Sequence, residues 1–331
     1  MRLAVDAMGG DHAPEQIVRG VLLALEDRPD LEVVLVGDEK QITKHLPKSH
    51  GRLRIVHTET VITAEEEPVR AIRRKKDASL VVACQMVKDK EVDAMITAGN
   101  TGAFMAAGLL IVGRIPGVHR PALAPKLPTF DRRGVLLLDA GANMDAKPEH
   151  LVQYAQMGEV YIQGTTGHEH VRIGLLNVGT EAGKGNELTK AVFQTLEKTP
   201  AFVGNVEARD VPFGVCDVLV CDGFAGNILL KTMEGTGMFF AHLLREMYGS
   251  GWLGKISALL IWKQMQALRK RLDYAEYGGA PLLGVDGLLI KSHGSSQARA
   301  IQQTIHQTAK AVRYGVVQRI AENIGKGETM G

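Results

Sequence analysis

Short loops rich in Gly, Asn, Asp and Ser or Thr carry the residues of this chain that could do chemistry. Six such loops each follow a short apolar run and precede a helix-like pattern: 7–11, 98–102, 139–143, 177–187, 221–227 and 292–296. Glycine lets the backbone approach a ligand closely, and a helix that begins beside it directs free N–H groups and a partial positive charge toward that ligand. The pattern therefore favours an enzyme that binds a phosphate or stabilises an acyl oxyanion.

The richest loop, 177–187, reads NVGTEAGKGNE. A lysine on a glycine loop can neutralise a phosphate with a point charge and backbone donors, without a metal. The loop departs from the nucleotide P-loop because three residues separate Gly179 from Gly183 and Gly185 occupies the hydroxyl position. We expect a phosphate contact from Lys184, although a solvated lysine in a turn is the alternative. The loop residues expected beside it are Asn177, Gly179, Glu181, Gly183 and Gly185.

Asparagines and aspartates lie at the ends of several predicted strands. The amides of Asn100 and Asn227 could donate to a carbonyl or phosphate oxygen, or each residue could cap a helix or occupy a turn. Asp6, Asp139 and Asp222 close their strands at the same level. Their carboxylates could hold lysines and loop N–H groups in place, or take part in acid–base chemistry.

Two histidines, His12 and His293, lie in opposite terminal loops, where either could transfer a proton, contact an anion or do neither. The sequence has no Cys or His spacing typical of zinc, no G-x-S-x-G nucleophile elbow and no convincing dinucleotide G-x-G-x-x-G. We therefore expect neither a metal nor a cofactor. The remaining loop residues expected to contact substrate are Gly9, Gly10, Asp11, Thr101, Gly102, Asn143, Gly223, Gly226, Gly294 and Ser295.

Alternating strands and helices are predicted to position these loops. The candidate strands are short and barely alternating, as is typical of strands covered on both faces: 3–6, 31–36, 53–57, 94–97, 134–138, 173–178, 218–221 and 288–290. Pro14, Pro68 and Pro148 mark helix starts. Because parallel strands point the same way, the loops that follow them should gather along one edge of a mostly parallel sheet. The prediction is a single α/β domain over residues 1–331.

A strand-free segment, 227–277, predicts a helical hairpin that turns at Gly249–Gly251 and protrudes from the sheet. Ile261, Met265, Leu268 and Leu272 form an apolar stripe that would pack in a dimer or within the chain. Apolar residues near the turn lie beside Lys and Arg, which suits an anionic membrane interface, with a packing contact as the alternative. This predicted membrane tip comprises Trp252, Leu253, Ile256, Leu259 and Leu260.

Composition limits the class of protein. At 331 residues and 45% hydrophobic content the chain can bury a large core, and a net charge of +2 gives no nucleic-acid signature. Three cysteines cannot all pair, and we interpret them as reduced core thiols of a cytosolic protein. No signal peptide is evident, and no apolar run approaches the roughly 20 residues that a spanning helix needs.

Taken together, the ordered loops resemble the bacterial phosphate acyltransferase family of phospholipid synthesis (PlsX). The matching segments begin at Val5, Arg73, Ile96, Asp139, Gly174, Cys221 and Lys291. The resemblance implies a homodimer with a three-layer α/β/α sandwich, as in phosphotransacetylases and in isocitrate and isopropylmalate dehydrogenases. It also implies acyl transfer from acyl-acyl carrier protein to inorganic phosphate. The acyl phosphate would pass to a membrane glycerol-3-phosphate acyltransferase, which implies a cytoplasmic protein in transient contact with the inner face of the cell membrane.

Phosphate is its own nucleophile in such a reaction, so no serine or cysteine is required. We expect Lys184 to hold phosphate, Asn227 and Asn100 to donate to phosphate or to the developing oxyanion, and His12 or His293 to protonate the leaving thiolate. The basic run Arg73, Arg74, Lys75 and Lys76 is either a solvated helix face or a docking patch for the acidic carrier protein. Rival readings are a phosphotransacetylase acting on acyl-coenzyme A, a dehydrogenase, and a non-enzymatic phosphate-binding or scaffold protein.

Overall fold

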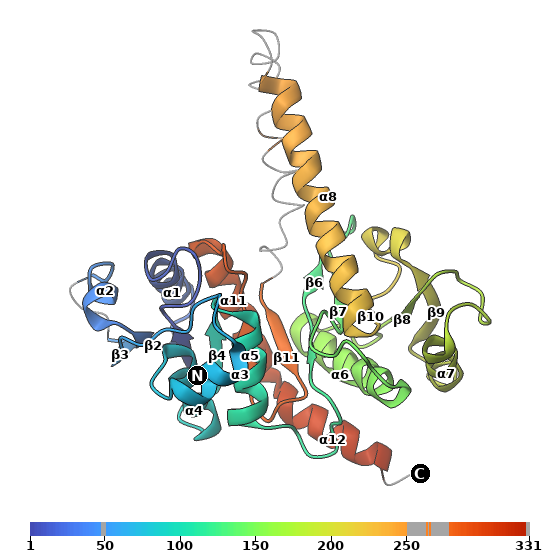
Figure 1. The fold of residues 1–331 in the computed structure, drawn as a ribbon, viewed down its shortest axis with the longest axis horizontal. Coiled ribbons are helices and arrows are strands. Elements are labelled where there is room, and N and C mark those ends of the chain that lie inside the picture. The colour runs from blue at the N-terminus through green and yellow to red at the C-terminus, as the bar shows by residue number, and fades with distance from the viewer. Residues whose placement is uncertain (48–50, 250–262, 264, 266–277, 329–331) are drawn as a thin grey trace.

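The structure of the chain is a computed structural model that describes residues 1–47, 51–249, 263, 265 and 278–328. It confirms the α/β class, with helices on both faces of mostly parallel strands (Figure 1). The predicted single sheet is instead divided into two sheets. The six polar loops therefore belong to two sheet edges, three loops to each.

Five strands that pair in parallel form most of the first sheet, and two further strands complete it through antiparallel pairing. Its order is β3 (Leu53–His57), β2 (Glu32–Gly37), β1 (Arg2–Asp6), β4 (Ala94–Thr97), β12 (Leu288–Lys291), β11 (Ala280–Leu283) and β5 (Ala122–Leu123). β4 pairs with β1 on one side and with β12 on the other. The loops that follow these three strands are consequently neighbours.

The second sheet has four parallel strands and one antiparallel strand. Its order is β6 (Lys126–Leu127), β7 (Val135–Leu138), β10 (Val218–Val220), β8 (Ile173–Asn177) and β9 (Phe202–Glu207). The loops after β7 and β10 are neighbours, whereas the loop after β8 lies one strand further from the first sheet.

The two sheets meet where the chain crosses from β5 to β6. The N–H of Ala140 donates to the carbonyl of Leu123 at 2.9 Å. The N–H of Leu123 in turn donates to the carboxylate of Asp139 at 3.0 Å. These bonds join the end of β7 to the last strand of the first sheet, so the edges of the two sheets are fixed relative to each other.

All eight predicted strands form, and 53–57 and 94–97 match β3 and β4 to the residue. The sequence patterns miss β5, β6, β9 and β11. Two residues are too few to show a period, Gly204 and Asn205 interrupt β9, and β11 contains Pro281. The three cysteines are buried and unpaired, as predicted.

Alternate residues of the strands pack into different cores, which is the physical basis of the three layers. Leu3 and Val5 of β1 lie in the core shared by both sheets, whereas Ala4 lies in a core on the opposite face. The shared core is covered by α1 (Glu15–Asp27), α2 (Glu39–Thr43), α6 (Pro148–Thr166), α7 (Glu187–Leu196), α11 (Ala298–Tyr314) and α12 (Val316–Glu328). The other faces are covered by α3 (Pro68–Arg74), α4 (Ser79–Lys88), α5 (Thr101–Ala107), η1 (Gly108–Val112), η2 (Ala208–Phe213) and α8 (Gly223–Gly249). The expected α/β/α layering is confirmed.

The longest helix, α8, projects from the body of the molecule (Figure 1). It forms the first arm of the predicted hairpin. The predicted membrane tip and the apolar stripe lie outside the described residues, apart from Met265, which is helical. None of the helices in the described ranges combines the length and hydropathy needed to cross a bilayer.

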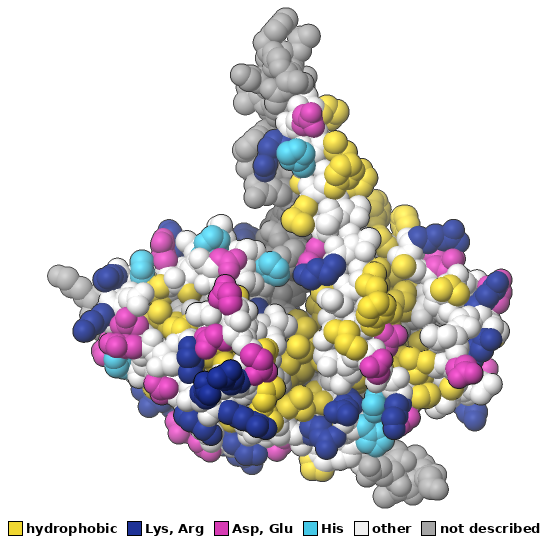
Figure 2. Space-filling view, viewed as in Figure 1, with side chains coloured by type: hydrophobic (Ala, Val, Ile, Leu, Met, Phe, Trp, Pro, Cys, Tyr) yellow, Lys and Arg dark blue, Asp and Glu magenta, His cyan; other side chains and the backbone are white. Residues whose placement is uncertain are grey.

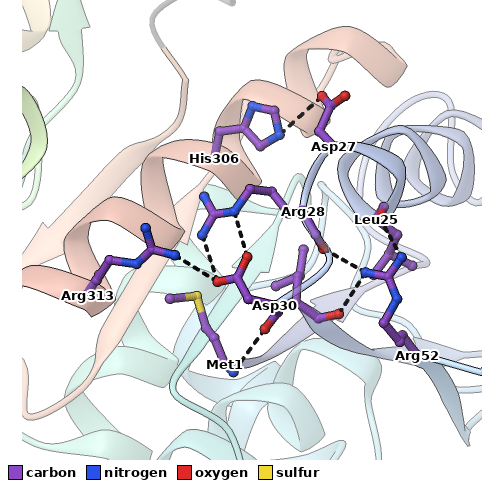
Figure 3. A network of polar contacts seen from close by, with 9 residues as sticks. Met1, Leu25, Asp27, Arg28, Asp30, Arg52, His306 and Arg313 are labelled. Carbon is purple, nitrogen blue, oxygen red and sulfur yellow. Dashed lines mark hydrogen bonds and ion pairs between the residues drawn. The ribbon is translucent and has the colours of Figure 1, made fainter.

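A network of polar contacts ties the end of α1 to α11 (Figure 3). The carboxylate of Asp30 accepts from the guanidinium groups of Arg28 and Arg313, each at 2.9 Å. Asp27 at the end of α1 lies 3.5 Å from the imidazole of His306. Because α11 follows the loop after β12, the network helps to hold that loop in its place beside β1.

Candidate active site

A cavity of about 280 Å³ lies where the two sheets meet, at the base of α8. The first sheet and its loops contribute Thr101, Leu123, Ala280, Lys291, Ser292, His293 and Ser296 to its lining. The crossing segment, the second sheet and α8 contribute Pro125, Lys126, Ala140, Asn227, Leu230, Lys231 and Glu234, and Gly278 and Gly279 complete the lining. The structure thus brings together four of the predicted loops, two from each sheet.

The three polar loops of the first sheet interlock around Asp6. The hydroxyl of Thr97 donates to the Asp6 carboxylate at 2.7 Å, and Asp6 is buried. A methyl group on Gly9 would lie 2.6 Å from that carboxylate and 2.7 Å from the nitrogen of Gly99, so only glycine fits there. The N–H of Asp11 donates to the carbonyl of Gly294 at 2.9 Å, which joins the loops after β1 and β12.

Lys291 ends β12 and extends into the space that these loops enclose. Only 7% of the residue is exposed, and it lines the cavity. Its ammonium donates to the carbonyl of Ala98 at 3.2 Å and to that of Ser292. Burial lowers the pKa of Lys291 to about 8, against the attraction of Asp6 and Asp11, which favours the charged form. Lys291 was not among the residues expected to contact substrate, although it begins one of the segments that carry the family resemblance.

In the second sheet, Asp139 is an acceptor for the loop that follows it. Its Oδ1 accepts from the N–H groups of Leu123, Gly141 and Ala142, and its Oδ2 accepts from the backbone and side chain of Asn143. Burial raises the pKa of Asp139, and these donors oppose that rise. Since the donors occupy both oxygens, Asp139 and Asn143 shape the junction of the sheets.

Asn227 is brought to the cavity by the start of α8. The Asp222 carboxylate accepts from the N–H of Ala225 at 2.9 Å and so caps the helix. A methyl group on Gly226 would lie 1.9 Å from the carbonyl of Asp139, and one on Gly223 would lie 2.6 Å from the carbonyl of Asn143. These two glycines let α8 begin directly against β7, one turn before Asn227 reaches the cavity.

Asn100 is a helix cap, the alternative that the sequence left open. Its side-chain oxygen accepts from the N–H of Ala103 at 3.0 Å. Its amide donates to the carbonyls of Thr63 and Ala64 at 3.0 and 3.2 Å. The amide is therefore committed to holding the start of α5, and the neighbouring Thr101 is the residue of this loop that lines the cavity. Gly102 packs against Pro68, the first residue of α3.

Lys184 lies on a loop apart from the cavity lining. Its ammonium is 4.0 Å from the Glu181 carboxylate, and 54% of its side chain is exposed. The loop is held by Asn177, whose amide donates to the carbonyl of Lys184 at 3.2 Å, and by Asn205, whose amide donates to the carbonyl of Glu181 at 2.9 Å. Of the loop glycines, Gly185 has a positive φ of 95° and Gly179 lies against Glu181, whereas a methyl group on Gly183 would meet no atom within 4 Å.

The two candidate histidines are separated by the structure. His293 lines the cavity, and its Nδ1 accepts from the N–H of Ser295 at 3.2 Å. Burial lowers the pKa of His293. His12 is an exposed residue in the turn before α1 and does not belong to the described cavity lining.

Lysines outnumber carboxylates in the cavity lining, where Lys126 and Lys231 accompany Lys291. Glu234 is the acidic residue among the described lining residues, and its carboxylate lies 2.7 Å from the ammonium of Lys231. Burial lowers the pKa of Lys126. The excess of cations favours an anionic ligand. Lys126 and Lys231 carried no sequence signal, because each lies outside the glycine-rich loops.

The basic run 73–76 divides into two groups. The ammonium of Lys75 pairs with Glu66 at 2.7 Å and donates to the carbonyl of Val61. Arg73 and Lys76 line a groove of about 650 Å³ together with apolar residues, and Arg74 is exposed. Figure 2 shows Lys and Arg side chains gathered over α3, next to hydrophobic side chains. The groove residues are Arg54, Val56, Ile72, Arg73, Lys76, Val81, Val82, Gln85, Met86, Asp89, Glu91, Leu110 and Ile111.

One cluster has the composition of a metal site. Ligand atoms of His119, Glu149 and His150 lie within 4.8 Å of one another. However, the Nδ1 atom of His150 accepts from the N–H of Lys147 at 3.1 Å. A ligating histidine usually donates from its second ring nitrogen, so this arrangement does not fit a metal ligand.

Comparison with known proteins agrees with this architecture. A family model described as fatty acid synthesis protein matches residues 1–319. In fold, the chain is similar to a phosphotransacetylase from Streptococcus pyogenes (TM-score 0.61, 15% identity, 95% of this chain and 94% of that one). It is also similar to a branched-chain phosphotransacylase from Enterococcus faecalis (TM-score 0.59, 14% identity, 94% of this chain and 99% of that one). The expected phosphotransacetylase-like fold is therefore confirmed.

Sequence relatives are much closer. A phosphate acyltransferase of Oceanobacillus iheyensis is 54% identical over 332 residues, which cover 99% of this chain and 99% of the relative. A phosphate acyltransferase of Brevibacillus brevis is 52% identical over 328 residues, with 98% of each covered. With more than half of its aligned residues identical to these enzymes over nearly its whole length, the chain belongs to the phosphate acyltransferase family.

Proposed function

We propose that this enzyme transfers a fatty acyl group from acyl-acyl carrier protein to inorganic phosphate, giving acyl phosphate and the free carrier thiol. The observation that carries the proposal is the lysine-rich cavity at the junction of the two sheets, in a chain of the phosphate acyltransferase family. At about 280 Å³ the cavity is slightly smaller than typical ligand pockets, which span roughly 300–1,000 Å³. It suits phosphate and the thioester group, with the acyl chain and the carrier extending outward.

In this proposal the enzyme contributes positioning and charge. The cavity lysines neutralise the phosphate, and its enclosure between two sheets removes water from the attacking oxygen. The amide of Asn227 donates to the phosphate or to the oxyanion that forms when a phosphate oxygen attacks the carbonyl carbon. Asn100 acts indirectly, by fixing the start of α5 and thereby Thr101.

Lys184 remains a proposed phosphate contact. Its side chain is 54% exposed and its ammonium lies 4.0 Å from an exposed carboxylate, so it can reach a ligand at the carboxyl edge of the second sheet. His293 and Lys291 both line the cavity, where either could protonate the leaving thiolate.

The groove beside α3 is the proposed docking surface for the carrier. The lining of this groove combines cations, such as Arg73 and Lys76, with apolar side chains, such as Ile72. An acidic, amphipathic helix complements such a surface. Lys75 is excluded from this role because Glu66 already pairs with it.

Dimer and membrane contacts are proposed for α8. Its outer part exposes a row of large apolar side chains, which Figure 2 shows along the projecting helix. The row consists of Met238, Phe239, Phe240, Leu243 and Met247. Exposed apolar surface of this kind marks an interaction site. We propose a homodimer through this helix and transient contact with the inner face of the cell membrane, where a glycerol-3-phosphate acyltransferase would receive the acyl phosphate.

The test is phosphate-dependent release of thiol from palmitoyl-acyl carrier protein, with acyl phosphate trapped by hydroxylamine. We expect saturable dependence on phosphate and equal amounts of thiol and hydroxamate. Release from palmitoyl-coenzyme A alone would move the assignment to a phosphotransacetylase. Binding of phosphate without turnover of either donor would contradict the proposal.

A further inference from the structure

Lys291 differs from Lys231 of the same cavity in its burial and in its hydrogen bonds. It is held at the end of a central strand, and two backbone carbonyls fix its ammonium. Lys231 in the same cavity has 61% of its side chain exposed and pairs with Glu234. An ammonium has three N–H groups, so the two carbonyls leave one of them for a ligand in the cavity.

We propose that Lys291 is a catalytic residue that carries the proton of the acyl transfer from the attacking phosphate to the leaving thiolate. This inference rests on the proposed function. In the step, an oxygen of HPO₄²⁻ forms a bond to the thioester carbon, and the carbon–sulfur bond breaks with its electron pair on sulfur. The ammonium of Lys291 gives a proton to sulfur, and the proton of the phosphate replaces it on Nζ. The products are acyl phosphate and thiol, and the lysine is unchanged.

The surroundings of Lys291 support this role. Asp6 from β1 and Asp11 from the next loop attract its charge. The other titratable groups in the described cavity lining are His293, Lys231 and Glu234 of α8, and Lys126 of β6, which is half-buried. Burial lowers the pKa of Lys291 to about 8, close to the roughly 8.5 of an ordinary thiol. A general acid works best when its pKa lies near the working pH, so such a lysine can both release and regain a proton.

Neither histidine is as well placed as Lys291 to protonate the leaving thiolate. His12 is exposed and is absent from the described cavity lining. The Nδ1 of His293 accepts from Ser295, and burial lowers the pKa of the ring, which leaves it neutral at pH 7 and above. At that pH the charged donor in the cavity is a lysine.

The test compares two donors that differ in their leaving thiol. An alkyl thioester of pantetheine needs a proton on sulfur, whereas an ester of 4-nitrothiophenol leaves readily as the thiolate. With the unmodified enzyme we expect kcat to fall above pH 8 for the pantetheine ester and to stay level for the aryl ester. Lys291→Met should lower kcat at least 100-fold with the pantetheine ester and less than 10-fold with the aryl ester. Lys291→Arg should keep phosphate binding but lose the fall above pH 8.

Lys88→Met is the matched control, because Lys88 also donates to a backbone carbonyl, that of Val112, but lies outside the described cavity lining. It should leave kcat and the pH profile unchanged. Equal losses with both esters in Lys291→Met, or an unchanged pH profile in Lys291→Arg, would overturn the proposal. So would identical profiles for the two esters with the unmodified enzyme, a measurement that needs no variant to fold. Failure of that enzyme to release thiol from any donor would instead refute the proposed function.

Discussion

The lysines at the carboxyl edges of the two sheets have opposite surroundings. In the first sheet, Lys291 is buried among interlocked loops, with Asp6 and Asp11 nearby. In the second, Lys184 is exposed on a loop that two asparagines hold in shape, and its nearest described charge is Glu181 at 4.0 Å. A fixed, desolvated cation suits proton transfer and charge stabilisation, whereas an exposed one suits capture of an incoming anion.

The difference has a structural cause. The loops after β1, β4 and β12 follow three neighbouring strands, and each covers part of the next. The loop after β8 follows a strand near the far side of the second sheet, with β10 on one side and β9 on the other. Similar glycine-rich sequences thus give a closed pocket in one place and an open loop in another.

The largest effect expected outside the cavity is that of Lys184→Ala. If Lys184 stabilises the transition state, kcat with phosphate should fall on the order of 100-fold, or about 2.7 kcal/mol. Steady-state kinetics with varied phosphate measure this. Lys190→Ala removes an exposed lysine from the following helix and serves as the control. Near-normal kinetics would remove Lys184 from the mechanism and leave the catalytic cation to the first sheet.

The glycines of the two edges should differ in stability. Gly9→Ala places a methyl group against Asp6 and Gly99, so it should lower the free energy of unfolding by about 1–3 kcal/mol. Gly183→Ala meets no atom within 4 Å and should change it by less than about 0.5 kcal/mol. Urea unfolding measures both. Equal effects would mean that the loops of the first sheet are not packed as tightly as described.

The charge reversal Arg73→Glu with Lys76→Glu tests whether the groove beside α3, on the first sheet, binds the acyl carrier protein. KM for the acyl carrier protein should rise about 10-fold with kcat unchanged, because the two charges attract an acidic partner. The rise should shrink as salt screens the attraction. Lys40→Glu with Lys44→Glu, at an exposed position of α2 and at the exposed residue that follows it, is the control. An unchanged KM at low and high salt would refute the docking surface.

The smallest effect is expected for Asp30→Asn, in the network that anchors α11. The hydrogen bond from Arg28 lowers the pKa of Asp30 below its ordinary value of 3.8. A carboxyl whose pKa is lowered by folding stabilises the native state above the unfolded-state pKa, and this contribution is lost as pH falls through the lower folded-state pKa. The variant should therefore cost at most about 1 kcal/mol at pH 7, since the Asp30 carboxylate is exposed to solvent, and less at pH 3.

Urea unfolding at the two pH values measures this cost, and Arg28→Gln with the double variant isolates the pair. A cost that grows at low pH would contradict the assignment. A shift in the pH profile of acyl transfer would show that the network reaches Lys291 as well as the fold.

Local patterns were enough to predict the strands, the proline-marked helix starts and the loops between them. Short β-branched runs such as 53–57 and 94–97 have few alternatives to a buried strand, and glycine-rich segments cannot continue a helix or strand. Four of the six predicted loops reach the cavity, and Asn227 and His293 were identified from their types and positions alone.

What the patterns missed depends on contacts between distant residues. The division into two sheets follows from β5 and β6, which are too short to show a period and form through pairing with β11 and β7. The amide of Asn100 is kept from a ligand by carbonyls 36 and 37 residues away, to which it donates. Lys126 and Lys231 become cavity residues only because the chain crosses between the sheets beside the start of α8.

The sequence by itself therefore determined the family, the α/β class and the presence of glycine-rich loops suited to an anion, because these are properties of residue type and local spacing. Only the tertiary structure decided which lysine is buried. Desolvation depends on what neighbouring strands and loops place around a side chain, and Lys184 and Lys291 lie in similar sequence contexts but in opposite surroundings.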